Sequence, residues 1–237
     1  KGRLVFASEI PALLALLGEK KRPDLQTAYD YLVHGDYGSN QHTFFEGIEQ
    51  LTPASYVEFD LTTSTLSQPV RWWTPKITEN STISFEDAVL KVREKFLDSV
   101  RLHLRSDVPI GAALSGGIDS SAIVCAMRRL QPDMPIHTFS YIAKGSKSEE
   151  KWVDLVNNHT GSVGHKITAT HEELIADIDK LISVQGEPFG STSMYAQYKV
   201  FQLAREKGVT VTLDGQGADE LLAGYLGYPG ERLLSLM

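Results

Sequence analysis

One short segment, residues 114–121, combines residue types that suit the binding of a pyrophosphate group. Two adjacent glycines, Gly116 and Gly117, are able to adopt positive φ and carry no Cβ, so backbone N–H groups there can approach an anion closely. Serine hydroxyls and the N-terminus of a following helix would add further donors. The segment consists of Leu114, Ser115, Gly116, Gly117, Ile118, Asp119, Ser120 and Ser121. We therefore expect a phosphate compound to bind at this 114–121 turn.

Asp119 indicates that a cation would bind at this turn together with the phosphate. A carboxylate repels phosphate unless a cation lies between them, so Asp119 predicts a bound Mg²⁺. The turn is not a Walker A loop, because no Gly-Lys pair occurs anywhere in the chain. It indicates instead the pyrophosphate loop of enzymes that cleave ATP between its α and β phosphates. A structural alternative stays open at this point: a glycine-serine turn between a strand and a helix, with Asp119 stabilising the helix N-terminus.

A second glycine-rich segment, residues 214–225, carries complementary residue types. It contains the residues Asp214, Gly215, Gln216, Gly217, Asp219 and Glu220. Its spacing misses the dinucleotide fingerprint Gly-x-Gly-x-x-Gly by one residue, because Glu220 stands in the last place. If both turns lie at one edge of a sheet, Asp119 and Asp219 could share a metal ion. The pair of turns favours a nucleotide site over two helix starts that merely carry acidic residues.

The elements around these turns alternate between strand-like and helix-like patterns. Strands are expected at residues 110–114, 136–141, 165–168 and 209–213. Helices are expected between them, with N-terminal caps at Ser84 and at Thr170, the latter paired with Glu173 in a capping box. Strands that alternate with helices predict an α/β fold, with a parallel sheet and helices on both faces. Both turns then follow the carboxyl ends of strands, where ligands of such sheets bind.

The first part of the chain has a different pattern. We expect a strand at residues 3–7, two short helices, and a hairpin formed by residues 56–60 and 65–73. A polar stretch at residues 74–81 then marks a boundary. The sequence therefore predicts a partial α+β segment over residues 1–75 and the parallel-sheet domain over residues 76–237, as pieces of a longer parent.

Composition excludes several classes of protein. The 237 residues are 42% hydrophobic, which is enough for a substantial core, and the net charge of −7 carries no basic stripe for nucleic acid. No apolar run is long enough to cross a bilayer, and the first residues lack the pattern of a signal peptide. The single cysteine, Cys125, is expected to be a buried thiol. We expect a cytoplasmic enzyme that binds neither nucleic acid nor membrane, and homodimerisation stays open.

With these residues in view, the chain resembles the glutamine-hydrolysing asparagine synthetase family. The resemblance rests on both turns and on residues 138–140, 187–188, 192–195 and 6–10. It implies a parent with an N-terminal glutaminase domain and a C-terminal domain of the PP-loop ATP pyrophosphatase fold, which is similar to the adenine nucleotide α-hydrolases. It also implies that aspartate is adenylated with ATP and Mg²⁺ to β-aspartyl-AMP, pyrophosphate is released, and ammonia from glutamine displaces AMP.

The resemblance assigns roles to individual residues. It implies that Asp119 and Asp219 bind the metal and that Glu220 and Gln216 join them in catalysis. It implies nucleotide contacts from both turns and from the neighbouring strand ends. These nucleotide contacts are Ala113, Leu114, Ser115, Gly116, Gly117, Asp119, Ser120, Ser121, Ser140, Tyr141, Asp214 and Gly215.

Three departures from the family pattern limit the prediction. Gln216 stands where well-known asparagine synthetases carry glutamate, the N-terminal nucleophilic cysteine of the glutaminase is absent, and the chain ends at Met237 before the active-site lysine of the family. We therefore expect these 237 residues alone neither to hydrolyse glutamine nor to complete amidation. Two alternatives stay open: an adenylating synthetase for another carboxylate, similar to the β-lactam synthetases, and a non-catalytic nucleotide-binding relative.

Overall fold

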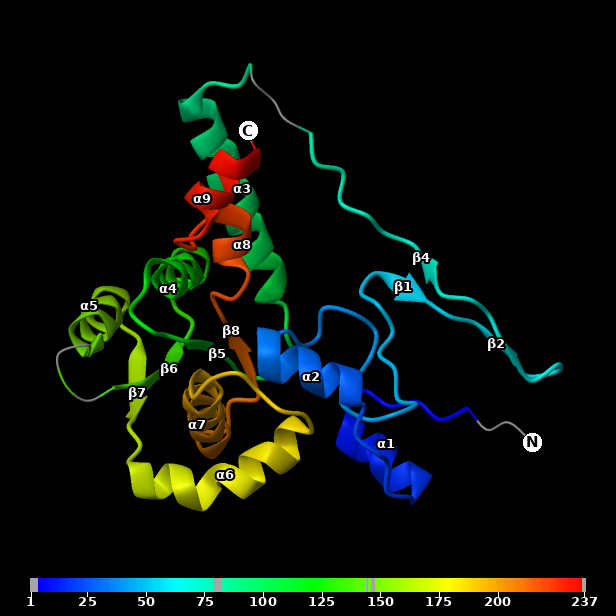
Figure 1. The fold of residues 1–237 in the computed structure, drawn as a ribbon. Coiled ribbons are helices and arrows are strands. Elements are labelled where there is room, and N and C mark those ends of the chain that lie inside the picture. The colour runs from blue at the N-terminus through cyan, green and yellow to red at the C-terminus, as the bar shows by residue number, and fades with distance from the viewer. Residues whose placement is uncertain (1–3, 79–81, 144, 146–147, 236–237) are drawn as a thin grey trace. The chain divides into compact units, whose positions relative to one another are not determined.

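A computed structural model describes residues 4–78, 82–143, 145 and 148–235 (Figure 1). Contacts between residues divide the chain into two compact units, which we call the N-terminal unit and the sheet unit. The N-terminal unit comprises Lys1–Ser81 and Ala176–Ser191, and the sheet unit comprises Thr82–Ile175 and Thr192–Met237. The sequence did not predict that residues from the second half of the chain would join the first unit. The boundary expected after residue 75 stays a prediction, and part of the polar stretch around it lies outside the described residues.

The sheet unit is built around four parallel strands, as the sequence predicted. They are β5 (Ile110–Ala113), β6 (His137–Tyr141), β7 (Val163–Ile167) and β8 (Val211–Leu213). Their order in the sheet is β7-β6-β5-β8, so β5 lies between β6 and β8. Because all four strands run in the same direction, the turns that follow β5 and β8 leave from the same edge of the sheet.

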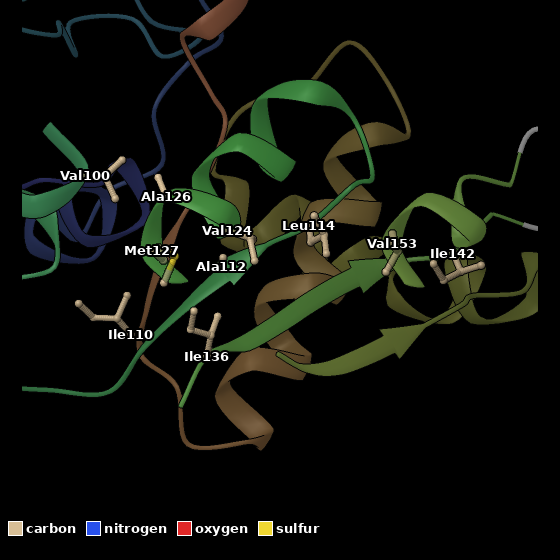
Figure 2. Close-up of a cluster of buried hydrophobic side chains, with 10 residues drawn as sticks. All are labelled: Val100, Ile110, Ala112, Leu114, Val124, Ala126, Met127, Ile136, Ile142 and Val153. Carbon is tan, nitrogen blue, oxygen red and sulfur yellow. The ribbon is translucent and has the colours of Figure 1, made fainter. Parts of the chain in front are cut away.

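Helices cover both faces of this sheet, which confirms the predicted α/β architecture. On one face lie α4 (Ile118–Leu130) and α5 (Glu150–Thr160), with α3 (Phe85–His103) packed on α4, and on the other lies α7 (Ser193–Glu206) (Figure 1). Figure 2 shows the core of the first face, where buried side chains of β5 and of Ile136 and Ile142, which flank β6, meet those of α4. Phe139 and three residues of α7 lead a second buried cluster. The two cores hold β5 and β6 rigidly between helical layers.

Helices α3 and α6 begin where the sequence placed their caps. The Ser84 side chain accepts a hydrogen bond of 3.1 Å from the backbone N–H of Asp87 at the start of α3. Thr170 and Glu173 exchange two hydrogen bonds at the start of α6 (His171–Gln185), which forms the predicted capping box. Two short helices, α8 (Ala218–Leu222) and α9 (Tyr228–Ser235), follow β8.

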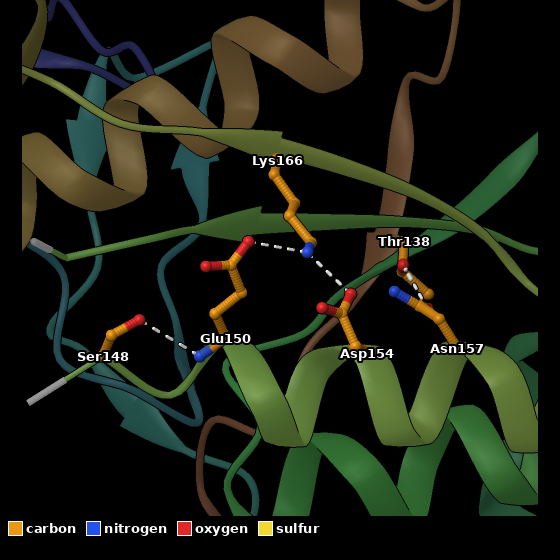
Figure 3. Close-up of polar contacts among 6 residues, drawn as sticks. All are labelled: Thr138, Ser148, Glu150, Asp154, Asn157 and Lys166. Atoms are coloured by element: carbon orange, nitrogen blue, oxygen red, sulfur yellow. Dashed lines mark hydrogen bonds and ion pairs between the residues drawn. The ribbon is translucent and has the colours of Figure 1, made fainter.

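Polar contacts tie β6 and β7 to helix α5 (Figure 3). The buried Thr138 hydroxyl donates to the Asn157 side chain over 2.7 Å. Lys166 on β7 forms ion pairs with Asp154 at 2.6 Å and Glu150 at 2.8 Å. The hydrogen bonds that its ammonium group donates to Asp154 and then to Glu150 raise the pKa of Lys166. These contacts fix the N-terminal half of α5, which packs against the 114–121 turn.

Arg128, near the C-terminus of α4, joins that helix to the ends of neighbouring elements. Its guanidinium donates hydrogen bonds to the carbonyls of Thr160 at 2.6 Å and Met134 at 2.9 Å.

We expect Arg128→Ala to lower the free energy of unfolding by about 2 kcal/mol, because both carbonyls lose a charged donor. Urea denaturation would measure the change. Arg129→Ala is the matched control, since Arg129 is exposed and is expected to change stability by less than about 0.5 kcal/mol. Equal effects of the two substitutions would contradict the role of Arg128.

A pair of histidines on adjacent strands, His137 and His165, is expected to make the stability of the folded chain depend on pH. His137 Nδ1 and His165 Nε2 lie 2.9 Å apart, so at least one ring must be neutral to accept the hydrogen bond. Burial, followed by the nearby charges of His137 and Lys207, lowers the pKa of His165 below its ordinary value of 6.5. The folded protein therefore binds this proton less tightly than the unfolded chain does, and stability falls as the pH drops below that value.

Urea denaturation at pH about 7.5 and about 5.5 would measure this loss of stability. His165→Gln is expected to flatten the pH dependence, because the lowered pKa is removed. His159→Gln provides the control, since His159 is exposed on α5 and should leave the pH dependence unchanged. An identical pH profile in the His165 variant would show that the pair does not titrate as described.

The N-terminal unit contains two helices and two small antiparallel pairs of strands. The helices are α1 (Ile10–Leu17) and α2 (Leu25–His34), and the strands are β1 (Ser55–Tyr56), β2 (Phe59–Asp60), β3 (Thr65–Leu66) and β4 (Val70–Arg71). β2 pairs with β3 and β1 with β4, which confirms the predicted hairpin. The strand expected at residues 3–7 is wrong for residues 4–7, because no other described segment pairs with them, and residue 3 lies outside the described part.

Residues 186–190 are held in the N-terminal unit by specific contacts. The Glu187 carboxylate accepts a hydrogen bond of 2.8 Å from the backbone N–H of Phe44. The Tyr31 hydroxyl donates to the carbonyl of Phe189 over 2.9 Å. In this structure Glu187 is thus a local anchor of the chain.

No helix in the described parts of the chain is both long enough and apolar enough to cross a membrane.

Candidate functional site

The strand order brings the two glycine-rich turns together. Ala112 of β5 pairs with Leu213 of β8, and each strand then runs directly into its turn. The turns touch at Gly215, where an added Cβ would lie 3.1 Å from Asp119 Cβ and 3.1 Å from the backbone nitrogen of Ser120. Only a residue without a side chain fits between them without a shift of the backbone. The predicted meeting of the two turns at one sheet edge is therefore observed.

Serine hydroxyls hold the 114–121 turn in shape. Ser115 Oγ and Ser120 Oγ lie 3.0 Å apart, and the backbone N–H of Gly117 donates to Ser115 Oγ over 3.2 Å. Ser121 Oγ donates to the carbonyl of Gly117 over 2.6 Å. The side chain of Ser121 is therefore engaged within the turn, while the first N–H groups of α4 have no partner within the helix. The anion-binding capacity of the turn lies mainly in those backbone groups and in the helix dipole.

Gly116 is required by both its conformation and its surroundings. Its φ of +90° lies in the left-handed region, and an added Cβ would lie 3.0 Å from Trp152 Cβ and 3.2 Å from the carbonyl oxygen of Glu149. The start of α5 thus supports the turn from outside. Gly117, in contrast, has a φ of −68°, so the predicted need for positive φ holds for Gly116 and not for Gly117.

A cavity of about 430 Å³ opens beside the two turns. Eleven of the residues predicted from the sequence line it, and they come from β5, β6, β8 and both turns. These residues are Ala113, Leu114, Ser115, Gly117, Asp119, Ser120, Tyr141, Asp214, Gly215, Gln216 and Asp219. The volume lies within the range of small-molecule sites.

The remaining predicted site residues lie outside the cavity lining. Gly116 and Ser121 support the turn from within, as described above. Ser140 is buried, its hydroxyl has no hydrogen-bond partner among the described residues, and it does not line the cavity. Glu220 is exposed and accepts a hydrogen bond of 2.8 Å from the Tyr225 hydroxyl, a contact that raises the pKa of this tyrosine. The catalytic role of Glu220 and the nucleotide contact of Ser140 stay predictions.

Helix α7 forms a wall of the cavity that the sequence did not predict. Its contribution is a single helical face, and Phe139 of β6 extends the apolar part of this wall. The α7 residues are Ser193, Met194, Ala196, Gln197, Val200 and Phe201. The spacing of residues 193, 197 and 201 is that of one face of a helix, but such a face alone does not distinguish a cavity wall from a core contact. The cavity is therefore lined by apolar side chains of α7 and β6 and also by the carboxylates of Asp119, Asp214 and Asp219.

Asp119 and Asp219 both line this cavity, and their binding of one shared ion stays a prediction. Asp219 lies close to the backbone of Gly224, where an added Cβ would overlap Oδ1 of Asp219. Among the described residues, no group of three or more His, Cys, Asp or Glu side chains is arranged to hold a metal ion. This donor set suits Mg²⁺ in nucleotide sites, where one or two carboxylates share the ion with phosphate oxygens and water. The residues present therefore fit a nucleotide-bound Mg²⁺.

Comparisons with known proteins identify the family to which this chain is similar. Residues 91–236 match the family described as asparagine synthase. A putative glutamine-hydrolysing asparagine synthetase 2 of Methanocaldococcus jannaschii is 30% identical over 224 residues, covering 94% of this chain and 43% of that protein. The glutamine-hydrolysing asparagine synthetase 3 of Bacillus subtilis is 28% identical over 235 residues, covering 93% of this chain and 38% of that protein.

The chain thus spans less than half the length of these two curated relatives. Among solved structures, an NH₃-dependent NAD synthetase from Campylobacter jejuni aligns with a TM-score of 0.40 and 19% identity, over 57% of this chain and 60% of that one. The family match covers more than half of the chain and includes both turns. This chain therefore belongs to the asparagine synthase family.

Proposed function

We propose that the protein containing this chain uses ATP to activate a carboxylate, releases pyrophosphate, and transfers the activated acyl group to ammonia. The observation that carries this proposal is the convergence of the 114–121 and 214–225 turns on one cavity. One turn offers backbone donors for an anion, and the other offers carboxylates. ATP with Mg²⁺ needs both kinds of group at the same place.

Different residues of the cavity would bind the phosphates, the adenine ring and the Mg²⁺ ion of the nucleotide. The N-terminus of α4 and the 114–121 turn would hold the phosphates that leave as pyrophosphate. Tyr141, Phe139 and Val200 provide an apolar part of the cavity for the adenine ring. Asp119 and Asp219 would hold Mg²⁺, which supplies neutralisation of the charge that develops on the leaving pyrophosphate.

The reaction requires that the protein position the reactants, and no residue of the protein has to form a covalent bond to the substrate. A carboxylate oxygen of the substrate forms a bond to the α-phosphorus of ATP while the bond to the β-phosphate oxygen breaks, which gives an acyl-adenylate and pyrophosphate. Ammonia then attacks the acyl carbon, the bond to the phosphate oxygen breaks, and AMP leaves as the nitrogen loses a proton. Fixed donors and closely held reactants are sufficient for both steps.

Aspartate is the acceptor that we propose, with asparagine as the product. The names of the relatives support this choice, and ammonia would come from glutamine through the glutaminase part of the whole protein. Gln216 is exposed and lines the cavity, so the acceptor side of the site carries an amide where the family pattern has a carboxylate. A different carboxylic acid is therefore the second candidate. The cytoplasmic location and homodimerisation considered from the sequence stay predictions.

The choice between these acceptors can be tested with the full-length protein. Pyrophosphate release would be measured with ATP, Mg²⁺ and ammonia, in the presence of aspartate and of a panel of other small carboxylic acids. The proposal expects release with aspartate and equimolar formation of asparagine. Release with another acid only would establish the second candidate. No release with any acid would favour a non-catalytic nucleotide-binding relative and contradict both enzymatic proposals.

A further inference from the structure

The segment of residues 186–190 is restrained at two points by hydrogen bonds within the N-terminal unit. The Glu187 carboxylate accepts one of 2.8 Å from the backbone N–H of Phe44. Two residues further on, the carbonyl of Phe189 accepts one of 2.9 Å from the Tyr31 hydroxyl. The partners of these bonds lie more than 140 positions away in the sequence, so the contacts are tertiary and not local.

The groups that hold this segment are themselves fixed by packing. The Tyr31 ring lies edge-on to the rings of Tyr37 and Phe44, with centroid distances of 5.7 Å and 5.4 Å. Thr43, which precedes Phe44, is buried and donates a hydrogen bond of 2.7 Å to the carbonyl of Ile48. Because the donors are held in place, their hydrogen bonds restrain the 186–190 segment in a defined position.

The restrained segment leads directly into the helix that forms one wall of the cavity. Only Ser191 separates the segment from Thr192, the N-cap of α7. Ser193 and Met194, in the first turn of α7, line the cavity, whereas Glu187 does not. A displacement of the segment is therefore passed to α7 through the covalent chain itself.

Apolar packing orients α7 but does not by itself fix its position along the helix axis. Its residues Val200, Leu203 and Ala204 form one buried cluster with Phe139 of β6. The hydrophobic effect that holds such a cluster has no direction, and small sliding of packed helices is a common mode of conformational change. The hydrogen bonds of the 186–190 segment supply a directional restraint that the apolar cluster lacks.

We propose that Glu187 and Tyr31 are positioning residues, whose hydrogen bonds to the 186–190 segment set the place of α7 and with it the cavity wall that meets ATP. This inference rests on the proposed function, because it requires ATP in the cavity. The α7 wall contacts the bound nucleotide before and during the reaction, so its displacement should raise KM for ATP and leave kcat nearly unchanged. The two glycine-rich turns leave strands of the sheet, so the groups proposed to act on the phosphates stay in place.

The test is the steady-state rate of pyrophosphate release by the full-length protein at varied ATP concentration, with Mg²⁺, ammonia and the carboxylic acid that supports release. Glu187→Met removes the acceptor at similar side-chain length, and it is expected to raise KM for ATP about fivefold with kcat changed by less than about twofold. Glu187→Gln keeps an oxygen that can accept from the N–H of Phe44 and should retain the KM of the unmodified protein. Tyr31→Phe removes a single oxygen atom from the second restraint and should also raise KM.

Tyr29→Phe is the matched control, since Tyr29 is an exposed residue of the same helix, α2. It should leave both KM and kcat unchanged. If Glu187 and Tyr31 served only to stabilise the fold, their substitution would lower the amount of folded protein, which reduces the apparent kcat at an unchanged KM.

That pattern would overturn the inference, as would unchanged constants in both Glu187→Met and Tyr31→Phe. An equal rise of KM in Glu187→Gln and Glu187→Met would overturn it as well, because the acceptor oxygen would then not matter. All three results would leave the proposed function intact. Failure of the unmodified protein to release pyrophosphate with any acid would instead contradict the proposed function, and the positioning role with it.

Discussion

Replacing Asp119 by asparagine is expected to lower the rate of pyrophosphate release about 100-fold to 1000-fold. The substitution keeps the shape of the side chain and removes the charge that would hold Mg²⁺ against the phosphates. Asp119 lies in the first turn of α4, lines the cavity and contacts the site of Gly215. Because only two cavity carboxylates are proposed as ligands, the loss of one should also raise the Mg²⁺ concentration required for half-maximal rate.

Asp133→Asn is the control for this change of charge. Asp133 is exposed in the loop that precedes β6, at the opposite edge of the sheet from the cavity. Its substitution should leave both the rate and the Mg²⁺ dependence unchanged. Circular dichroism melting of both variants would show that neither loses its fold. An unchanged Mg²⁺ requirement in Asp119→Asn would count against the assignment of Asp119 as a metal ligand.

Adding one methyl group at Gly215 is expected to lower the rate of pyrophosphate release about 10-fold to 100-fold. The new Cβ would lie 3.1 Å from Asp119 Cβ and 3.1 Å from the backbone nitrogen of Ser120, and a backbone atom cannot rotate away. The two turns would then move apart by a few tenths of an ångström. Gly215 does not require positive φ, so the predicted effect comes from this close approach and not from backbone strain.

Gly227→Ala separates this effect from a general effect of alanine. An added Cβ at Gly227 meets no atom within 4 Å, and its backbone does not require glycine. This variant should therefore keep the activity of the unmodified protein. The steady-state rates of the two variants at saturating ATP and Mg²⁺ provide the comparison. Equal activity of Gly215→Ala and Gly227→Ala would show that the contact between the turns is not needed for the reaction.

Sequence patterns were sufficient to predict the order of strands and helices in the sheet unit as far as β8, but not the short helices α8 and α9. Caps such as Ser84 and Thr170 begin helices where their hydrogen bonds predicted, because capping depends on residues only a few positions apart. The sequence also placed both turns at the carboxyl ends of parallel strands, whereas the adjacency of β5 and β8, which brings the turns into contact, is seen only in the structure. Right-handed crossovers between parallel strands place successive strand ends at one edge of the sheet.

Features that depend on distant contacts were not predictable in this way. The wall formed by α7 is an example, since Gln197 and Phe201 lie on a helical face that could equally have packed in a core. The strand expected near the N-terminus is another, because β structure requires a partner that local sequence does not reveal. Glu187 likewise shows its role only through its hydrogen bond to Phe44, which is far away in the sequence.

The central claim is that ATP is cleaved between its α and β phosphates. Its most direct test is to identify the products formed from ATP in the complete reaction. The full-length protein would be incubated with ATP, Mg²⁺, aspartate and ammonia, and the nucleotides and phosphates would be separated by chromatography. We predict AMP, pyrophosphate and asparagine in equal amounts, with all three strongly reduced in Asp119→Asn. Formation of ADP and inorganic phosphate instead would contradict the proposal, because the bond between the β and γ phosphates would then be the one that is cleaved.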